Sequence, residues 1–270
     1  MEKDKSHSWE DAVRWLKSQP AQQELVRACF YDDPLLDAAA RYWSSTEWKA
    51  VQKLLPPNKG KALDIGAGRG ISSYALARDG WTVTALEPNP SAMVGAGAIR
   101  GLAAQAGFDI AIAETWGEQL PFEDDVFDVV HCRQVLHHAR DLGQLCREIG
   151  RVLKPGGCFI ATREHVISRK EDLPVFLDRH PLHKFYGGEN AFLLQEYEEA
   201  IKNADIVLTR TFNPAQSDIN LFPETKSAVK RRMAARLHLP AALVPDFYLA
   251  WRGSRDNTPG RIYTFVGHAK

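Results

Sequence analysis

The sequence predicts an α/β fold with a doubly wound, mostly parallel sheet. Between residues 61 and 162, short apolar runs that suit buried strands alternate with stretches of helical period. This alternation favours parallel pairing with right-handed crossovers, because each helix returns the chain to the same edge of the sheet. Residues 61–70, KALDIGAGRG, pass from strand to glycine turn to helix, and the rest of the chain is organised around them.

Three alternating glycines, Gly66, Gly68 and Gly70, form the predicted turn, and Asp64 and Ala67 lie beside them in the sequence. Glycine is needed where φ is positive or where a ligand approaches the backbone, and the helix that follows offers free N–H groups. The turn therefore indicates a cradle for a nucleotide or a carboxylate. Its spacing differs from the G-x-G-x-x-G fingerprint and from the G-K-[ST] of a P-loop. A tight turn without a ligand is the alternative.

A second signal is the alternating strand WTVTALEPN, residues 81–89, which ends on an acid about twenty residues after the turn. A carboxylate at this spacing can accept hydrogen bonds from two adjacent ribose hydroxyls. We therefore expect Glu87 to bind a ribose, with Pro88 in the same site. An ordinary solvated glutamate is the alternative, and the agreement in register with the turn disfavours it.

Length and composition suit one α/β domain with additions. The chain has 270 residues, 44% apolar and 25% charged, which is ordinary for a globular protein. Lys+Arg and Asp+Glu are equal at 34 each, which argues against a broad nucleic-acid surface. The N-terminus has no apolar h-region, and no apolar run is long enough to span a membrane, so a cytoplasmic protein is expected.

The four cysteines show no C-x-x-C pairing and lie mostly in apolar stretches: Cys29, Cys132, Cys146 and Cys158. We interpret them as reduced structural thiols in a reducing compartment. Neither disulfides nor a bound metal are expected.

Residues 1–57 are predicted to form a helical cap ahead of the main domain, residues 58–270. Capping-box patterns at residues 8–11 and 44–47 begin two of the expected helices. Aromatic residues are dense between residues 30 and 48. They either pack the cap on the core or roof a ligand site.

The main domain continues with elements in alternation. They are a helix over residues 91–105, a strand over 108–113, a strand over 127–132, a helix N-capped by Asp141 and a strand over 158–162. The helix after Asp141 has one apolar face, which indicates packing on the sheet.

Four further motifs occur in a fixed order: E-Q-L-P-F at residues 118–122, F-D-V-V at 127–130, V-L-H-H at 135–138 and L-K-P-G-G at 153–157. With the acid-x-G-x-G-x-G turn, this set resembles the ubiquinone/menaquinone-biosynthesis-like branch (methyltransferase type 11) of class I S-adenosylmethionine-dependent methyltransferases. The resemblance covers roughly residues 61–163. It implies a Rossmann-like, seven-stranded sheet and S-adenosyl-L-methionine as the cofactor.

The resemblance also implies the parts of the cofactor site. The glycine turn would hold the methionine end, Glu87 the ribose, and the loop of Trp116, Gly117 and Glu118 the adenine, with the Gly117 N–H donating to the ring. Trp116 stands where the family often has Asp. An indole cannot accept from the adenine amino group, so a carbonyl, a water or stacking of Trp116 would replace the Asp. Arg133 falls where the family places residues beside the methionine moiety.

Residues 164–194 join the fifth strand to the next helix through a polar and aromatic stretch too long for an ordinary loop. Long connections at the carboxyl ends of strands bind substrate in α/β folds, so this segment, the lid, is expected to cover the acceptor. His165 and His183 are candidate bases, and His183 and Tyr186 are candidate acceptor ligands; no catalytic residue is assigned. Both histidines of the V-L-H-H motif are expected to be structural.

A helix around Tyr197 and strands over residues 205–211 and 261–268 are expected to complete the sheet. Between these strands lies an insertion, residues 212–260, with a basic helix over 223–238. Its Lys and Arg side chains either form a solvated face or bind an anionic partner.

The favoured function is methyl transfer to a small molecule, at oxygen, with a carbohydrate, a quinone-like compound or another metabolite as acceptor. A non-catalytic module that keeps the cofactor pocket is one alternative. An RNA methyltransferase that uses the basic helix is another; the balanced charge and the lack of an N-P-P-Y-type motif after the fourth strand disfavour it. Neither nucleic-acid nor membrane partners are expected, and the oligomeric state is left open.

Overall fold

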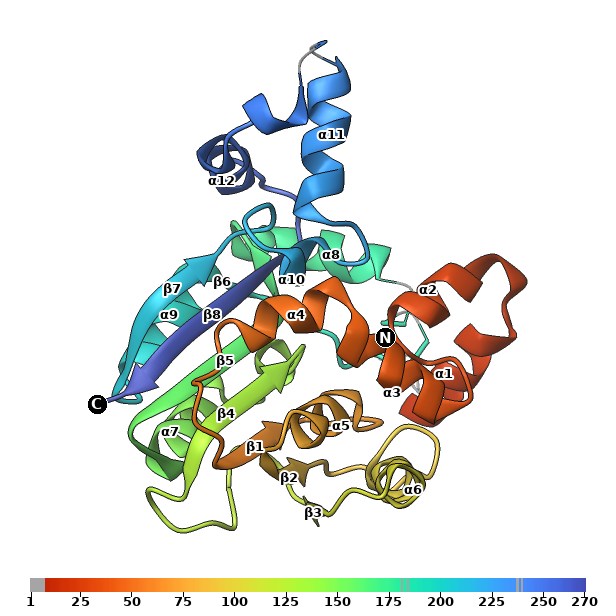
Figure 1. The fold of residues 1–270 in the computed structure, drawn as a ribbon, viewed down its shortest axis with the longest axis vertical. Coiled ribbons are helices and arrows are strands. Elements are labelled where there is room, and N and C mark those ends of the chain that lie inside the picture. The colour runs from red at the N-terminus through yellow and green to blue at the C-terminus, as the bar shows by residue number, and fades with distance from the viewer. Residues whose placement is uncertain (1–7, 181, 184, 237, 239) are drawn as a thin grey trace.

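The central layer of the protein is one mixed sheet (Figure 1). The computed structural model describes residues 8–180, 182–183, 185–236, 238 and 240–270. Within these residues, eight strands form the sheet in the order β3-β2-β1-β4-β5-β8-β7, with β6 beside β5. They are β1 (Lys61–Ile65), β2 (Thr82–Leu86), β3 (Ile110–Ala113), β4 (Phe127–Arg133), β5 (Leu153–Ile167), β6 (Phe192–Leu193), β7 (Ile206–Phe212) and β8 (Arg261–Ala269).

Pairing is parallel from β3 through to β5, and β8 is antiparallel to both of its neighbours. The prediction of a doubly wound, mostly parallel sheet is therefore confirmed. The short β6 adds an eighth strand to the expected seven, because it pairs with the last two residues of β5.

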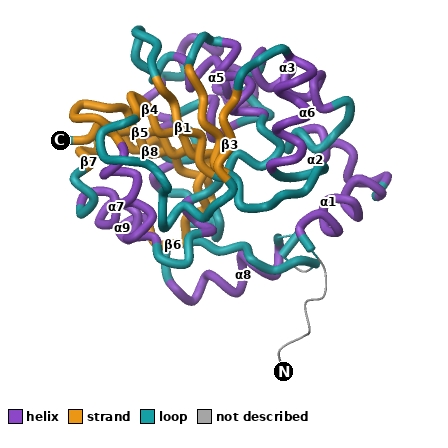
Figure 2. Tube along the Cα trace, turned by 90° about the horizontal axis from the view of Figure 1, so that it is seen from below, coloured by secondary structure: helices purple, strands orange, loops and turns teal. Residues whose placement is uncertain are grey.

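Helices cover both faces of the sheet (Figure 2). On one face lie α3 (Leu35–Ser44), α4 (Thr46–Gln52), α5 (Ile71–Arg78) and α6 (Ala96–Ala106), and on the other α7 (Leu142–Val152) and α9 (Leu194–Lys202). Asp141 caps α7 as predicted, since its side chain accepts from the Gln144 N–H. Because helices cover both faces of the sheet, the loops that follow the parallel strands lie together at the carboxyl edge of the sheet.

α6 begins later than the helix predicted over residues 91–105. The Ser91 hydroxyl accepts hydrogen bonds from the N–H groups of Met93 and Val94. These bonds give the backbone donors a partner outside a helix, so residues 92–94 form a turn and α6 starts at Ala96.

The N-terminal helices begin at side-chain caps. α1 (Trp9–Ser18) has the predicted capping box of Ser8 and Asp11, and α2 (Gln23–Ala28) follows. α4 is capped by Ser45, one residue later than the predicted pattern begins, because the Ser45 side chain accepts from the Trp48 N–H.

One carboxylate joins this N-terminal part to the end of α5. Asp79 accepts hydrogen bonds from Trp43 Nε1 at 2.8 Å, Trp48 Nε1 at 2.9 Å and Gln52 Nε2 at 2.8 Å. Trp48 is fully buried, so its indole N–H depends on this acceptor. These two tryptophans thus pack the N-terminal helices on the core.

Replacing Asp79 with Ala is expected to lower the free energy of unfolding by about 2–4 kcal/mol, because three donors lose a charged acceptor. Urea titration followed by tryptophan fluorescence measures the change. Asp109→Ala, at an exposed position, is the control and should change it by less than about 0.5 kcal/mol. Equal effects of the two substitutions would show that Asp79 does not hold the N-terminal helices.

Between β7 and β8 the chain forms α10 (Asp218–Leu221), α11 (Lys226–Arg236) and α12 (Asp246–Ser254). α11 and α12 stand away from the sheet (Figure 1). Ion pairs neutralise part of the basic helix: Asp246 pairs with Lys226 and Lys230, and Glu224 pairs with Arg232.

β5 is longer than the strand predicted over residues 158–162 and takes in the first part of the expected lid. Glu164 and His165 pair with β8. Arg163 has a φ of +62° where the register shifts, so the strand bends without ending. The prediction of a loop was wrong here because these polar residues interrupt the apolar pattern. His165 therefore lies on a strand.

Apolar contacts hold the remainder of the lid. α8 (Leu173–Arg179) places Phe176 against Ile167 and Ala191. Leu182 packs in a cluster with residues of α1 and α2. The lid is thus anchored both to β5 and to the N-terminal helices.

No described helix has the length and apolar character needed to cross a membrane. All four cysteines are free thiols. Burial raises the pKa of Cys146 to about 12 and that of Cys132 well above its ordinary value, which makes both thiols unreactive.

Candidate active site

The three glycines of the turn differ in what surrounds them. φ is +62° at Gly66, +54° at Gly68 and +83° at Gly70, the left-handed region that favours glycine. A Cβ at Gly66 would lie 2.6 Å from Val135, and one at Gly70 would lie 3.2 Å from Ile99. At Gly68 a Cβ would meet nothing within 4 Å. Gly66 and Gly70 therefore permit close packing, whereas Gly68 has open space beside it.

Glu87 follows β2 and faces the glycine turn. Its carboxylate accepts hydrogen bonds from the N–H groups of Gly68 at 2.8 Å and Asn89 at 2.9 Å. Burial raises its pKa, and these two donors oppose the rise. The acid predicted to bind ribose thus stands at the turn predicted to hold the methionine end, and Pro88 follows it on the same loop.

Asp64 lies behind the turn and not among the groups that face the open space. One carboxylate oxygen accepts from the Ser73 hydroxyl at 2.6 Å, and the other lies 2.9 Å from His131 Nδ1. The side chain is fully buried. Both oxygens are bound within the core, so Asp64 joins β1 to α5 and β4. This differs from the predicted cofactor contact.

The loop after β3 lies across the end of β1, where the resemblance places the adenine. A Cβ at Gly117 would lie 3.5 Å from Ile65 of β1. Trp116 is 56% exposed, and the Arg140 guanidinium lies 4.6 Å from its ring centre. The Glu118 carboxylate accepts from the Arg140 N–H. Stacking of the exposed indole on the adenine therefore stays a prediction, as do the carbonyl and the water that could replace the missing Asp.

Arg133 ends β4, and its side chain turns toward the N-terminal helices. Nε lies 2.7 Å from one oxygen of Glu47 on α4, and Nη2 lies 3.1 Å from the other. The guanidinium also lies over the rings of Phe30 and Tyr42. This bidentate pair fixes the guanidinium, so the predicted contact with the methionine end would come from the Arg133 backbone.

His183 and Tyr186, the predicted acceptor ligands, lie between α8 and β6. Tyr186 is 38% exposed, and its ring centre lies 5.5 Å from that of Trp9 on α1. Phe185 stacks on Trp15 of the same helix at 5.3 Å. His183 is half-buried. The lid thus rests on α1 through aromatic contacts.

His165, the other candidate base, lies beside residues that the sequence assigned to structure or did not single out. Its ring centre is 4.7 Å from that of His137 and 5.9 Å from that of His180. Glu189, on the loop before β6, lies 3.8 Å from His137 Nε2. Burial lowers the pKa of His165 to about 3 and that of His137 well below its ordinary value, so both rings are neutral at pH 7. The V-L-H-H and Gly-Gly-Glu segments can be recognised in the sequence. No local sequence pattern indicates that they meet in the fold.

The turn after α2 carries two residues whose pKa values are raised by burial. Desolvation raises the pKa of Tyr31, and the charges of Cys29 and Glu189 add to the rise. Burial likewise raises the pKa of Cys29, whereas Arg133 and Arg163 lower it. The Arg133 guanidinium lies 5.7 Å from the ring centre of Phe30, so this turn lies beside the carboxyl end of β4.

Backbone strain gathers in the same region. Phe30, Gln134 and Arg163 have φ values of +60°, +58° and +62°. The Gln134 N–H donates to the Thr162 carbonyl, which ties two of these bends together. Non-glycine residues in the left-handed region persist where the surrounding structure holds them, and they cluster at functional sites.

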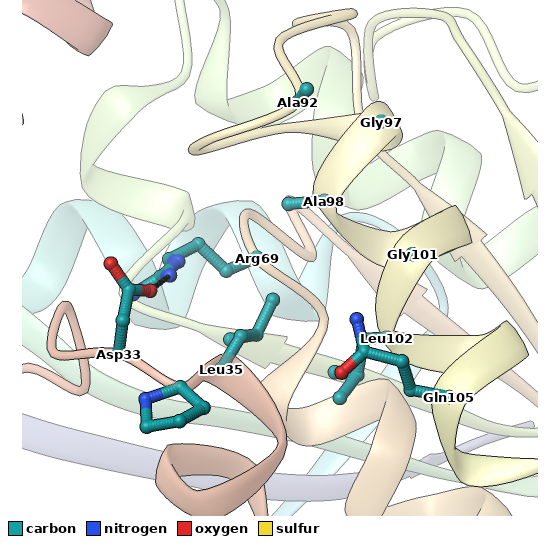
Figure 3. A pocket seen from close by; sticks show the side chains of 10 residues that line it. Asp33, Leu35, Arg69, Ala92, Gly97, Ala98, Gly101, Leu102 and Gln105 are labelled. Carbon is teal, nitrogen blue, oxygen red and sulfur yellow. Dashed lines mark hydrogen bonds and ion pairs between the residues drawn. The ribbon is translucent and has the colours of Figure 1, made fainter.

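A cavity of about 290 Å³ lies beside the glycine turn, between the start of α3 and α6 (Figure 3). Arg69 forms part of its wall and pairs with Asp33, and small residues such as Gly97 and Gly101 line the opposite side. None of the residues predicted to bind the cofactor lines this cavity. The cofactor site at the carboxyl ends of β1, β2 and β4 therefore stays a prediction that this cavity does not support.

Comparison with known proteins covers the same part of the chain. Residues 63–161 match the family described as "Methyltransferase domain". The ubiquinone biosynthesis O-methyltransferase of Caulobacter vibrioides is 39% identical over 102 residues, 37% of this chain and 39% of that protein. The dimethylglycine N-methyltransferase of Parasynechococcus marenigrum is 34% identical over 108 residues, 39% of this chain and 38% of that protein. The chain thus spans about two fifths of the length of these curated relatives.

Solved structures share the fold over a longer stretch. A geranyl diphosphate methyltransferase, solved with GPP and sinefungin, is 17% identical with a TM-score of 0.63 and covers 97% of this chain and 98% of its own. A protein from Galdieria sulphuraria described as a sarcosine dimethylglycine methyltransferase is 22% identical with a TM-score of 0.56, covering 88% and 89%. At such identities the likeness shows the fold alone.

The sheet order, the glycine turn and the match of residues 63–161 to a methyltransferase domain support an S-adenosylmethionine-dependent methyltransferase, with S-adenosylmethionine as its cofactor. Over residues 63–161 the chain is similar to a methyltransferase domain and to relatives named ubiquinone biosynthesis O-methyltransferase. The residues at the edge of the sheet fit the cofactor, since Gly68 leaves open space beside the backbone and Glu87 presents a carboxylate there.

We expect Glu87→Ala to weaken cofactor binding by about 1–3 kcal/mol, because two charge-assisted hydrogen bonds to the ribose are lost. Isothermal titration with S-adenosylmethionine measures the loss. Glu87→Gln keeps the size and one acceptor oxygen, so its affinity should be intermediate. Unchanged affinity in Glu87→Ala would remove Glu87 from the site.

Gly68→Val should abolish measurable cofactor binding, because its side chain would fill the open space beside the turn. Gly107→Val is the matched control: Gly107 has a φ of +69°, and a Cβ there also meets nothing within 4 Å, but it ends α6. Both variants should lose about 1–2 kcal/mol of stability from backbone strain. Titration should show binding in the control alone; a folded Gly68→Val that bound tightly would contradict this placement of the turn.

Proposed function

We propose that this chain transfers the methyl group of S-adenosylmethionine to an oxygen of a small molecule, such as a carbohydrate or a quinone-like metabolite. The observation that best supports the proposal is the cluster of neutral histidines and one carboxylate beside the cofactor turn. Such a cluster can orient a hydroxylated acceptor through hydrogen bonds.

A chain of contacts joins the cofactor turn to this cluster. Val135 lies against Gly66, and its N–H donates to the Glu164 carboxylate at 3.1 Å. The other oxygen of Glu164 lies 2.6 Å from His137 Nδ1. An acceptor beside His137 and Glu189 would therefore stand next to the methionine end of the cofactor.

The cofactor supplies an electrophilic methyl group, and the protein must align an acceptor oxygen with it and exclude water. Alignment alone can supply effective molarities on the order of 10⁵ M. A pKa of about 3 makes His165 a weak base, so the burial that keeps its ring neutral argues against proton abstraction by this residue. His183 remains a candidate base.

The parts outside the family match are proposed to build the acceptor site. They are the N-terminal helices that precede residue 58 and, within the domain of residues 58–270, the lid (164–194) and the insertion (212–260). The contact of Tyr186 with Trp9 supports a lid that closes against α1. Closure of this kind would shield the acceptor from water.

Nucleic acid is a weaker candidate acceptor. Asp246 and Glu224 pair with three cations of the basic helix and offset two of their charges. The pKa of Asp246 is lowered to about 2 by its hydrogen bonds to Lys226 and Lys230, although solvent screens these exposed pairs. RNA affinity with a steep salt dependence would favour this alternative.

Incubation of the chain with S-adenosylmethionine labelled in its methyl group, together with pools of metabolites, tests the proposal. Mass spectrometry is expected to find the label on a hydroxylated small molecule. Transfer to RNA alone would favour the RNA alternative. If the cofactor bound and the label never left it, the chain would be a non-catalytic binding module.

His183→Ala and Tyr186→Phe are expected to keep the cofactor Kd within about twofold, well under 1 kcal/mol, because the predicted cofactor ligands lie outside the lid. Turnover of the identified acceptor should fall at least about tenfold, as expected of groups that position the acceptor. Parallel titrations and rate measurements separate the two effects. Loss of the cofactor in both variants, or full turnover in both, would make the lid a structural segment only.

A further inference from the structure

Two histidines and one carboxylate converge at the carboxyl ends of β4 and β5. His137 lies in the turn Leu136–His138 after β4, His165 lies on β5, and Glu189 lies on the loop before β6. One potential ligand atom from each lies within 4.8 Å of the other two. His137 is 1% exposed and His165 is 8% exposed, so the protein holds both rings inside.

Hydrogen bonds on the outer side of each ring decide which nitrogen is available. His165 Nδ1 lies 2.8 Å from the Gly260 carbonyl, which can only accept, so Nδ1 carries the proton. His137 Nδ1 lies 2.6 Å from the Glu164 carboxylate, which also accepts from the His137 N–H. Nε2 of each ring is therefore left with a lone pair.

The Glu189 carboxylate lies near these rings without hydrogen-bonding to them. One of its oxygens is 3.8 Å from His137 Nε2 and 3.9 Å from His138 Nε2, and the other is 3.8 Å from His180 Nδ1. These distances exceed hydrogen-bond length. Lone pairs and a carboxylate that face one another repel unless a cation lies between them. Ligand atoms that share one ion at about 2.1 Å stand roughly 3–3.5 Å apart, so these three atoms, which lie within 4.8 Å of one another, must approach before all of them bind it.

We propose that His137, His165 and Glu189 bind a divalent first-row transition-metal ion. Imidazole nitrogens select ions such as Zn²⁺ or Fe²⁺ over Mg²⁺ and Ca²⁺, which prefer oxygen ligands alone. Glu164 and the Gly260 carbonyl supply the outer hydrogen bonds that orient metal-binding histidines. The sequence predicted no bound metal because that expectation was based on the spacing of the cysteines.

The loop that carries Glu189 can close the remaining distance. Gly187 and Gly188 precede it, with φ values of +78° and +87°. Three protein ligands leave a position on the ion for a further group. An acceptor hydroxyl in that position would have its pKa lowered by the ion, which would supply the activation that His165 as a base lacks. This last role rests on the proposed function, whereas metal binding does not.

Calorimetric titration of the untagged, chelator-treated chain with Zn²⁺ tests the site. One ion should bind per chain, and Zn²⁺ should raise the melting temperature. Glu189→Ala and His165→Asn should each weaken binding at least about tenfold. In His165→Asn the amide keeps a donor toward the Gly260 carbonyl. Glu189→Ala changes a loop residue, so at least this variant should fold. His268→Ala, at an exposed histidine of β8, is the matched control and should bind as the parent does.

Co²⁺ gives a second readout, because a site of nitrogen and oxygen ligands with fewer than six groups absorbs visible light more strongly than the hydrated ion. Glu189→Ala should lose this absorption. Absence of Zn²⁺ and Co²⁺ binding in the parent chain would overturn the proposal, as would equal affinity in Glu189→Ala. Neither measurement involves methyl transfer, so their failure would leave the proposed function standing.

Discussion

A buried carboxylate, Glu164, joins the two strands on which the candidate active site depends. It accepts hydrogen bonds from the N–H groups of Val135 and His137, each at 3.1 Å, and lies 2.6 Å from His137 Nδ1. Burial raises its pKa, and the backbone donors oppose the rise. A buried charge is tolerable only with such partners, so the position of the segment after β4 is set by β5.

The hydrogen bonds of Glu164 influence two neighbouring regions, the glycine turn and the histidine cluster. Val135, held by Glu164, packs against Gly66 and so supports the glycine turn from beneath. On the other side, Glu164 fixes the tautomer of His137 and leaves Nε2 directed to Glu189. The left-handed bends at Gln134 and Arg163 allow β4 and β5 to present these groups at one edge. One buried acid thus couples the geometry of the glycine turn to that of the histidine cluster.

The sequence was sufficient to predict those parts of the fold and site whose signals lie within a few neighbouring residues. The glycine turn, the strand that ends before Glu87 and the capping of α7 by Asp141 each follow from residues close together in the chain. β5 beyond residue 162 was not predictable in this way, because Glu164 and His165 are buried by pairing with β8, at the far end of the sequence. The partners of Asp64, the Glu47 pair of Arg133 and the approach of Glu189 depend in the same way on tertiary contacts.

A crystal structure with S-adenosylhomocysteine, the demethylated cofactor, tests the placement of the active site most directly. The expected result has the ribose hydroxyls on Glu87, the adenine against the loop of Trp116 and Gly117, and the sulfur directed toward His137 and Glu189. A ligand bound instead in the cavity beside Arg69, with Glu87 bonded only to Gly68 and Asn89, would contradict this placement.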